Sequence, residues 1–149
     1  MAKVRPFRAI RFNPSEIPEI GDVLAPPFDV ITTADNIALQ ERNPHNIVRL
    51  ELGERENVET NESNVYIRSA NQFFEWQNQG ILIREKTPAF YLVKENYGGT
   101  KNSKERIGLF AAVQLEEFAN KVVLPHEQTA EGPKKDRFQL MTTCEASFS

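Results

Sequence analysis

Apolar residues recur along this chain at two spacings, one typical of helices and one typical of strands. Between residues 64 and 79, four apolar residues have the spacing of one helix face: Tyr66, Ala70, Phe73 and Phe74. Asn61 or Ser63 can cap the start of this helix, and Gly80 follows its last turn. The pattern predicts one long amphipathic helix whose aromatic stripe lies in the core. Trp76 falls off this stripe, so partial burial at the helix edge is expected for it.

Runs rich in apolar residues predict strands in other stretches. Residues 89–97 and 105–115 are two such runs, and the Gly-Gly turn between them is typical of a β-hairpin. Residues 3–12 suit an edge strand or an irregular one, because Pro6 cannot donate a ladder hydrogen bond. Residues 81–84 predict a further short strand.

Two elements are predicted between the edge strand and the long helix. Thr32 or Thr33 can cap a short helix that runs to about Arg42, where Asn-Pro ends it. Residues 45–52 then alternate between apolar and polar, so we expect a strand that ends at Gly53.

Together these elements predict an α+β fold. A mostly antiparallel sheet, containing the hairpin, is expected to pack on the one long amphipathic helix at residues 64–79. Residues 1–149 contain no internal repeat or low-complexity linker, so a single α+β domain is expected. The last helical pattern reaches no cap before Ser149 and leaves three apolar residues with few obvious partners: Phe138, Met141 and Phe148. We therefore expect a domain truncated at its C-terminal end, the N-terminal part of a larger protein.

Composition limits the classes of function. The 149 residues are 40% hydrophobic and 26% charged, with a net charge of −3, so no global basic field would attract nucleic acid. Cys144 is the only cysteine, which excludes an internal disulfide and a Cys-rich zinc site. His45 and His126 are the only histidines and lack the spacing of a zinc hydrolase, so no metal site is predicted. No apolar run resembles a signal peptide, and the cytoplasm is the expected compartment, with no membrane partner.

A positive cluster near the end of the chain indicates an anion site. Gly132-Pro133 predicts a break followed by proline at the first position of a new helix. Lys134, Lys135 and Arg137 follow at once, although the positive end of a helix dipole disfavours cations by roughly a few tenths of a kcal/mol each. We predict that Arg137 and Lys134, with Thr129 upstream, bind a phosphate or nucleotide there. The alternative is a solvated polar loop with a charged helix start.

Titratable residues near this cluster are candidates for chemistry. Glu127 is predicted as a general base, and His126 as its neighbour or as a phosphate ligand. Asp29 is presented from the stiff Pro26-Pro27 segment and could join the same site. It could equally form a structural corner in which it accepts backbone N–H bonds.

Four motifs in this order resemble a known family. They are Arg5-Pro6-Phe7-Arg8-Ala9, Ala25-Pro26-Pro27-Phe28-Asp29-Val30-Ile31, Asn43-Pro44-His45-Asn46 and His126-Glu127-Gln128-Thr129. The chain is similar, from Lys3 to its last residue, to the uncharacterised prokaryotic family known as domain of unknown function 1015. That family usually has Tyr where this chain has Phe28. Its longer members carry an Asp-Gly-His-His-Arg-Tyr segment that is similar to one in the ParB-like free-serine kinases and is absent here.

The resemblance implies a nucleotide-dependent phosphoryl transfer to a small hydroxyl compound, with this chain supplying only part of the site. The candidate cofactors are then ATP or ADP with Mg²⁺, and the partner is a small molecule or nucleotide. Two other classes stay open. One is a non-catalytic, ParB-like regulatory module that binds nucleotide or nucleic acid, and the other is a structural interaction domain. The sequence leaves the oligomeric state open.

Overall fold

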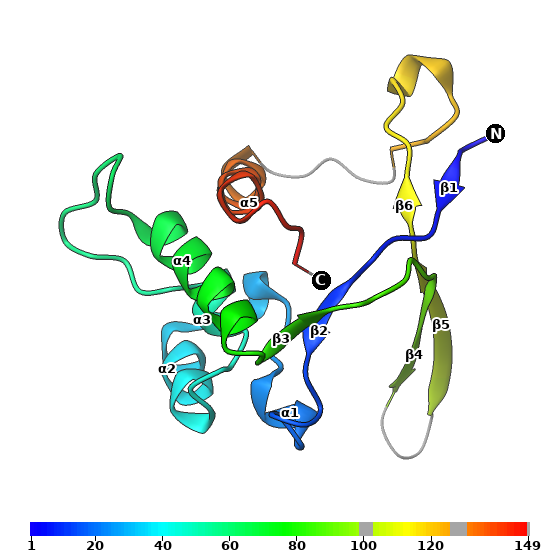
Figure 1. Cartoon of the computed structure of the whole chain (residues 1–149). Helices are drawn as coiled ribbons and strands as arrows, with labels where there is room; N and C mark the ends of the chain where they lie inside the picture. The colour runs from blue at the N-terminus through cyan, green and yellow to red at the C-terminus, as the bar shows by residue number, and fades with distance from the viewer. Residues whose placement is uncertain (99–102, 126–130, 149) are drawn as a thin grey trace. The chain divides into compact units, whose positions relative to one another are not determined.

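The computed structural model describes three stretches of the chain: residues 1–98, 103–125 and 131–148 (Figure 1). Their contacts group the chain into two compact units. The strand unit comprises Met1–Arg11 and Arg84–Gln128, and the helical unit comprises Phe12–Ile83 and Thr129–Ser149. The expectation of a single domain over residues 1–149 stays a prediction.

The described part of the helical unit contains helices of two kinds (Figure 1). The longer helices are α2 (Thr33–Arg42), α4 (Val65–Asn78) and α5 (Glu131–Cys144). The shorter ones are α1 (Ile20–Val23), the 3₁₀ turn η1 (Phe28–Val30) and α3 (Val48–Glu51). Helix α4 contacts both α5 and α3, and α2 contacts α1 and α3. These contacts make a helix-on-helix arrangement, which needs an apolar core between the helices.

That core is formed by side chains from nearly all the helices. Among the described residues, every buried apolar side chain belongs to the helical unit; they include Val23, Leu39, Val48, Leu50, Phe73, Trp76 and Leu140. Removing apolar surface from water is the main favourable term in folding. The stability of the helical unit therefore depends on these contacts between short helices.

The ends of α2 and α4 are formed by their own local sequence. Thr32 caps α2 in a capping box with Asp35, each side chain bonding the other residue's backbone N–H. The Asn64 side chain caps α4 by accepting from two backbone N–H groups of its first turn, so the predicted caps, Asn61 and Ser63, are wrong. Gly80 follows α4 with φ of +76°, a conformation that glycine adopts without steric cost. Both predicted helices are confirmed.

The buried face of α4 differs from the predicted stripe. Trp76 is 3% exposed and belongs to the core, whereas Phe74 is 45% exposed. The buried face is centred on Val65, Ser69 and Phe73, about one residue earlier than expected. The prediction that Phe74 is a core residue is therefore wrong, and so is the expectation of only partial burial for Trp76. Because Ser69 is buried although it is polar, a search for apolar residues at helical spacing does not identify this face.

The strand predicted at residues 45–52 is wrong, because this stretch forms α3 and its flanking turns. Asn46 is 0% exposed, and its amide donates to the backbone oxygens of Asp22 (2.9 Å) and Leu24 (3.1 Å). Its side-chain oxygen accepts from the Val48 N–H (3.1 Å) at the start of α3. These contacts with a distant segment hold the chain in a helical turn, which local alternation cannot reveal.

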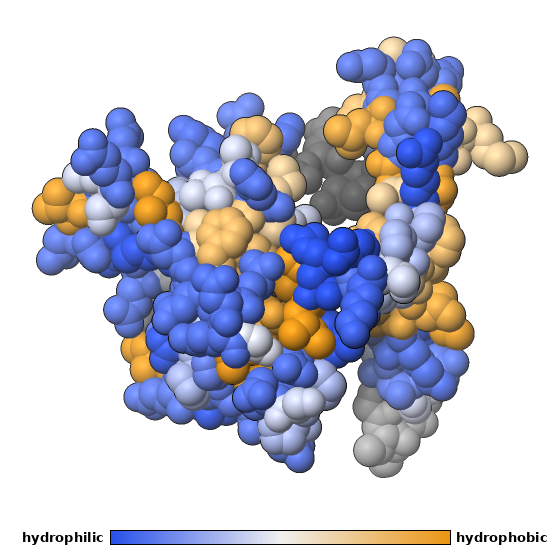
Figure 2. Space-filling model, viewed as in Figure 1, coloured by the Kyte–Doolittle hydropathy of each residue, from blue (hydrophilic) through white to orange (hydrophobic). Residues whose placement is uncertain are grey.

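The strand unit contains the predicted hairpin. Strand β4 (Tyr91–Tyr97) pairs antiparallel with β5 (Lys104–Phe110), with Leu92 opposite Leu109. The residues at 99–102 that would form its turn lie outside the described part of the chain. Figure 2 shows apolar side chains exposed on this unit beside charged ones, and Leu92 and Leu109 are among the exposed residues. The hairpin is confirmed.

Shorter pairs complete the sheets. Strand β1 (Val4–Arg5) pairs antiparallel with β6 (Ala112–Val113), and η2 (Phe118–Asn120) follows. Strand β2 (Ile10–Phe12) pairs with β3 (Leu82–Arg84), and the division between the units falls within these two strands. The α+β class is thus confirmed, with short antiparallel pairs in place of one larger sheet. Packing of the hairpin on α4 stays a prediction, because they belong to different units.

No helix in the described ranges combines the length and the apolar character needed to cross a bilayer.

Candidate functional site

Two adjacent hollows in the helical unit share one wall. The polar hollow has a volume of about 260 Å³ and is lined by residues that include Thr32, Thr33, Asn36, Arg55, Tyr66 and Asp136. The apolar hollow has a volume of about 470 Å³ and is lined by residues that include Phe28, Lys134, Phe138, Met141 and Phe148. Glu51, Arg137 and Leu140 line both. The larger hollow falls in the size range of small-molecule sites, roughly 300–1,000 Å³.

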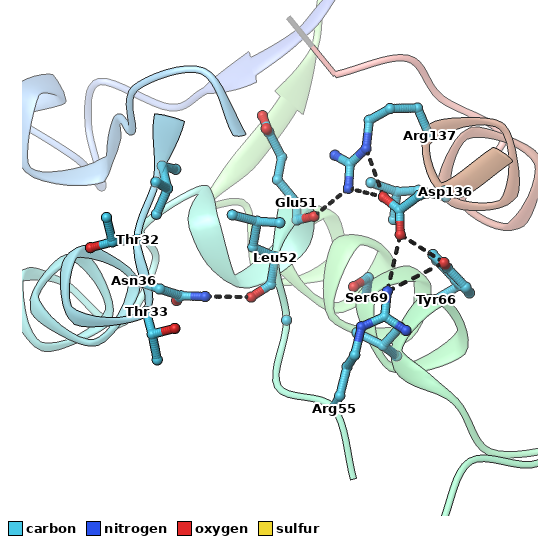
Figure 3. Close-up of a pocket in the computed structure, with 14 residues that line it drawn as sticks. Thr32, Thr33, Asn36, Glu51, Leu52, Arg55, Tyr66, Ser69, Asp136 and Arg137 are labelled. Atoms are coloured by element: carbon cyan, nitrogen blue, oxygen red, sulfur yellow. Dashed lines mark hydrogen bonds and ion pairs between the residues drawn. The ribbon is translucent and has the colours of Figure 1, made fainter. Parts of the chain in front are cut away.

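Arg137 is the centre of this shared wall. Its Nε and Nη2 donate to Oδ2 of Asp136 at 3.0 and 2.6 Å, and Nη2 also donates to the backbone oxygen of Glu51 at 2.8 Å (Figure 3). Its guanidinium carbon lies 4.3 Å from the centre of the Phe28 ring, within cation–π range. No acceptor for Nη1 occurs among the residues that the structure describes. The guanidinium is therefore fixed in place with one nitrogen available.

Asp136 is the acceptor at the centre of the network. Besides Arg137, its Oδ1 accepts from the Tyr66 hydroxyl at 2.8 Å and from Nη2 of Arg55 at 3.0 Å (Figure 3). Burial of the carboxyl raises its pKa, but the hydrogen bonds from Arg137 and Tyr66 and the two guanidinium charges outweigh this and lower the pKa below its usual value. Asp136 therefore stays ionised and joins α5, α4 and the segment after Gly53.

Glu51, the last residue of α3, is in the opposite situation. Burial raises the pKa of its carboxyl above the usual value, and the nearby charge of Arg137 opposes that shift only in part. Figure 3 shows the carboxyl pointing away from the bonded network around Asp136. Within the described ranges, no side-chain or backbone group donates to it. Two carboxylates beside one arginine thus have pKa shifts of opposite sign.

The far wall of the polar hollow is the start of α2. Thr32, Thr33 and Asn36 line it, and the Asn36 amide donates to the backbone oxygen of Leu52 at 2.9 Å. The Thr32 hydroxyl is already used in the capping box. Gly53 lines the hollow as well, and a Cβ there would lie 3.1 Å from the Arg49 backbone oxygen. Close packing of this glycine brings the α3 end against α4.

Comparison with protein-family models matches residues 4–149 to the family described as protein of unknown function (DUF1015). The chain belongs to this family. No curated protein and no solved structure matches it. The family resemblance of the motifs is therefore confirmed, whereas the similarity to ParB-like kinases stays a prediction.

Two of the predicted anion ligands of this DUF1015 chain come together at one hollow. Arg137 and Lys134, one turn apart on α5, both line the apolar hollow. The predicted helix start is wrong, because α5 begins at Glu131 and includes Gly132 and Pro133 in its first turn. Proline is tolerated there, since the first N–H groups of a helix have no partner within it.

The other predicted residues are not brought to these hollows. Asp29 lies in η1, is exposed and lines neither hollow, although its neighbour Phe28 stacks on Arg137. His126, Glu127 and Thr129 lie outside the described residues of the DUF1015 chain, so their roles stay predictions.

Sequence reasoning missed the partners of Arg137. Asp136 is its sequence neighbour, and a carboxylate beside the positive cluster could have indicated that part of the cluster is already paired. The sequence did not indicate that Glu51 contacts Arg137, because the strand predicted at residues 45–52 put Glu51 on one face of a strand. Among the described residues, no group of three His, Cys, Asp or Glu side chains could hold a metal ion.

Proposed function

We propose that the helical unit binds the phosphate groups of a nucleotide at Arg137, and that the natural protein transfers a phosphoryl group from this nucleotide to a small hydroxyl compound. The observation that carries the proposal is the position of Arg137 between a polar and an apolar hollow. A nucleotide also has a polar, anionic part and a flat apolar part. The two hollows offer each part a matching surface.

The guanidinium of Arg137 is prepared for an anion. Its bonds to Asp136 and to the Glu51 backbone, with the stack on Phe28, fix its orientation before any ligand arrives. A fixed group loses less conformational entropy on binding than a free side chain. The Nη1 group, which has no acceptor in the described part of the chain, could then donate to a phosphate oxygen.

Lys134 adds a second positive charge at the rim of the apolar hollow. It is exposed and lies one helical turn before Arg137. A flexible ammonium group suits a phosphate as a point charge, while Arg137 provides the directed bond. Glu127, His126, Thr129 and Asp29 remain the proposed catalytic and phosphate-contacting residues from the sequence.

Mg²⁺ would accompany ATP or ADP in such a reaction, held by the phosphates themselves. The described residues do not fit a protein-held metal, since they contain no cluster of three candidate ligands. The proposed contribution of Arg137 and Lys134 is therefore binding and orientation of the phosphates.

The test is a calorimetric titration of ATP and of ADP into the natural gene product and its variants. Lys134→Ala should weaken binding about tenfold, the loss expected for one charge-assisted bond of roughly 1.5 kcal/mol. Lys135→Ala is the matched control: it is the neighbouring exposed lysine, removes the same charge and lines neither hollow. Equal affinity of the Lys134→Ala and Lys135→Ala variants would contradict the proposal.

Arg137→Lys gives an independent arm. It keeps the charge but loses the forked donor set, so affinity should fall by more than in Lys134→Ala. Thermal unfolding of each variant without ligand shows whether the helical unit is still folded.

A non-catalytic nucleotide-binding regulatory module is the second candidate. It is supported because the described residues supply binding groups, with Arg137 and Lys134 lining the apolar hollow. Nucleotide binding by the natural protein without phosphate transfer to any small hydroxyl compound would favour this module. Nucleic acid is a weaker candidate ligand, because the net charge is −3.

A further inference from the structure

Two carboxylates flank Arg137 and have different surroundings. Asp136 accepts hydrogen bonds from Arg137, Arg55 and Tyr66. Among the described residues, Glu51 accepts only through its backbone oxygen, and its carboxyl points away from this network (Figure 3). Paired titratable groups with such contrasting environments commonly divide structural and proton-transfer roles.

We propose that Glu51, in place of the sequence-predicted Glu127, is the general base of the phosphoryl transfer, accepting the proton of the attacking substrate hydroxyl. The inference rests on the proposed function and adds a catalytic residue to it. Asp136 cannot take this part, because its lone pairs are already engaged by three donors.

The position of Glu51 suits this role. It is one of the residues that line both hollows, so a nucleotide or a substrate in either hollow would lie beside it. Its backbone oxygen is held by Nη2 of Arg137 at 2.8 Å, which fixes the base close to the proposed phosphate ligand. General-base catalysis requires such proximity, and a pKa shifted towards the working pH assists it. Burial raises the pKa of Glu51 in that direction.

The reaction balances without a further reagent. The O–H bond of the substrate breaks, and its proton moves to a Glu51 carboxylate oxygen. The substrate oxygen forms a bond to the transferred phosphorus, and the bond from phosphorus to the bridging oxygen of the nucleotide breaks. The electron pair of that bond stays on the bridging oxygen of the departing ADP or AMP, and Glu51 later releases its proton to water.

The charged and titratable groups that surround Glu51 in the two hollows are Arg137, Lys134, Asp136, Arg55 and Tyr66. Burial disfavours the ionised form of Glu51 and raises its pKa, whereas the charge of Arg137 favours the ionised form. Because Asp136 stays ionised to lower pH, Glu51 should set the acid limb of the pH profile. That limb should flatten when Glu51 is replaced by a residue that does not titrate.

The test compares Glu51→Gln with wild type in the natural gene product, by initial rates of phosphate transfer from ATP and ADP to free serine and related hydroxyl compounds. Glu51→Gln should lower kcat about 10²- to 10⁴-fold, with nucleotide affinity within about twofold of wild type and the acid limb lost. Glu54→Gln is the matched control, because Glu54 is close by, exposed and outside both hollows. Its kcat should match wild type.

The outcomes separate this inference from the proposed function. If Glu51→Gln keeps more than about half of the wild-type kcat, Glu51 is not the base, while binding and transfer still stand. Loss of transfer in Glu127→Gln but not in Glu51→Gln would assign the role to Glu127 instead. Nucleotide binding without any transfer would overturn the base role and leave the binding module. A wild-type protein that binds no nucleotide would overturn the proposed function as well.

Discussion

The guanidinium of Arg137 stacks on the ring of Phe28, with 4.3 Å between its central carbon and the ring centre. This contact joins α5 to η1, two elements from opposite ends of the sequence. It also places the Pro-rich motif of the family beside the positive cluster of α5. The chemistry of the site therefore depends on the aromatic face of residue 28, and a hydroxyl on that ring is not required for the stack.

Phe28→Leu should remove this stack while keeping an apolar side chain. We expect a loss of about 0.5–2 kcal/mol in the free energy of unfolding, the range of cation–π contacts from exposed to desolvated sites. Phe28→Tyr is the control, because it keeps the ring face and should leave stability nearly unchanged. Urea unfolding of the three proteins, followed by circular dichroism, measures the difference. An equal loss in both variants would show that the guanidinium contact contributes nothing specific.

Asn46 should be among the least replaceable polar residues of the helical unit. Asn46→Leu would leave the Asp22 and Leu24 carbonyls and the Val48 N–H without their partner. Each unsatisfied buried group costs about 1–3 kcal/mol, so a loss of at least about 3 kcal/mol is expected. Asn61→Leu, at an exposed position, should change stability by less than about 0.5 kcal/mol. A loss below about 1 kcal/mol in Asn46→Leu would mean that water replaces these bonds.

Local sequence was sufficient where local interactions decide the structure. The capping box of Thr32 and Asp35, the Asn64 cap and the pairing of two apolar strands that follow each other in the sequence all depend on residues close together in the chain. It failed at α3, where Asn46 and its contacts with residues 22–24 override an alternating pattern. It also failed at the face of α4, because burial of Ser69 depends on its neighbours in the fold.

The same distinction holds for the candidate site. Arg137 and Lys134 were identified from charge alone, since cations at a helix start need an explanation. Glu51 and Phe28 could not be predicted as partners of Arg137, because they meet it only through the tertiary fold. The opposite pKa shifts of Glu51 and Asp136 arise from burial and hydrogen bonding, neither of which a sequence shows.

Replacing Gly53 by alanine tests how tightly the wall of the polar hollow is packed. In Gly53→Ala the new methyl group would lie 3.1 Å from the Arg49 backbone oxygen and 3.3 Å from both Ser69 Oγ and Val65 Cγ2. These distances are tighter than normal contacts, so the variant should lose about 1–3 kcal/mol, as overpacked sites do. Gly21→Ala is the matched control, with nothing within 4 Å of its added Cβ. Thermal unfolding should show a lower Tm for Gly53→Ala alone. An unchanged Tm would mean that the neighbouring atoms shift to accommodate the methyl group at little cost.

Ionisation of Asp136 should make the stability of the helical unit depend on pH in the acidic range. Its pKa is lowered in the folded protein, so its ionised form contributes stability that is fully present above the unfolded pKa, near 3.8, and is lost as the pH falls through the still lower folded value. Asp136→Asn removes this charge, so at neutral pH the variant should be less stable than wild type by about 1–2 kcal/mol. This is the strength of a charge-assisted hydrogen bond, reduced because the site is partly exposed to solvent. As the pH drops below about 4, the wild-type protein should lose this advantage and the two unfolding curves should converge. Asp29→Asn, at an exposed position outside the network, should show no comparable neutral-pH loss. A difference between Asp136→Asn and wild type that stays constant from pH 7 to pH 2.5 would indicate that shape and hydrogen bonding matter at this position, and that charge does not.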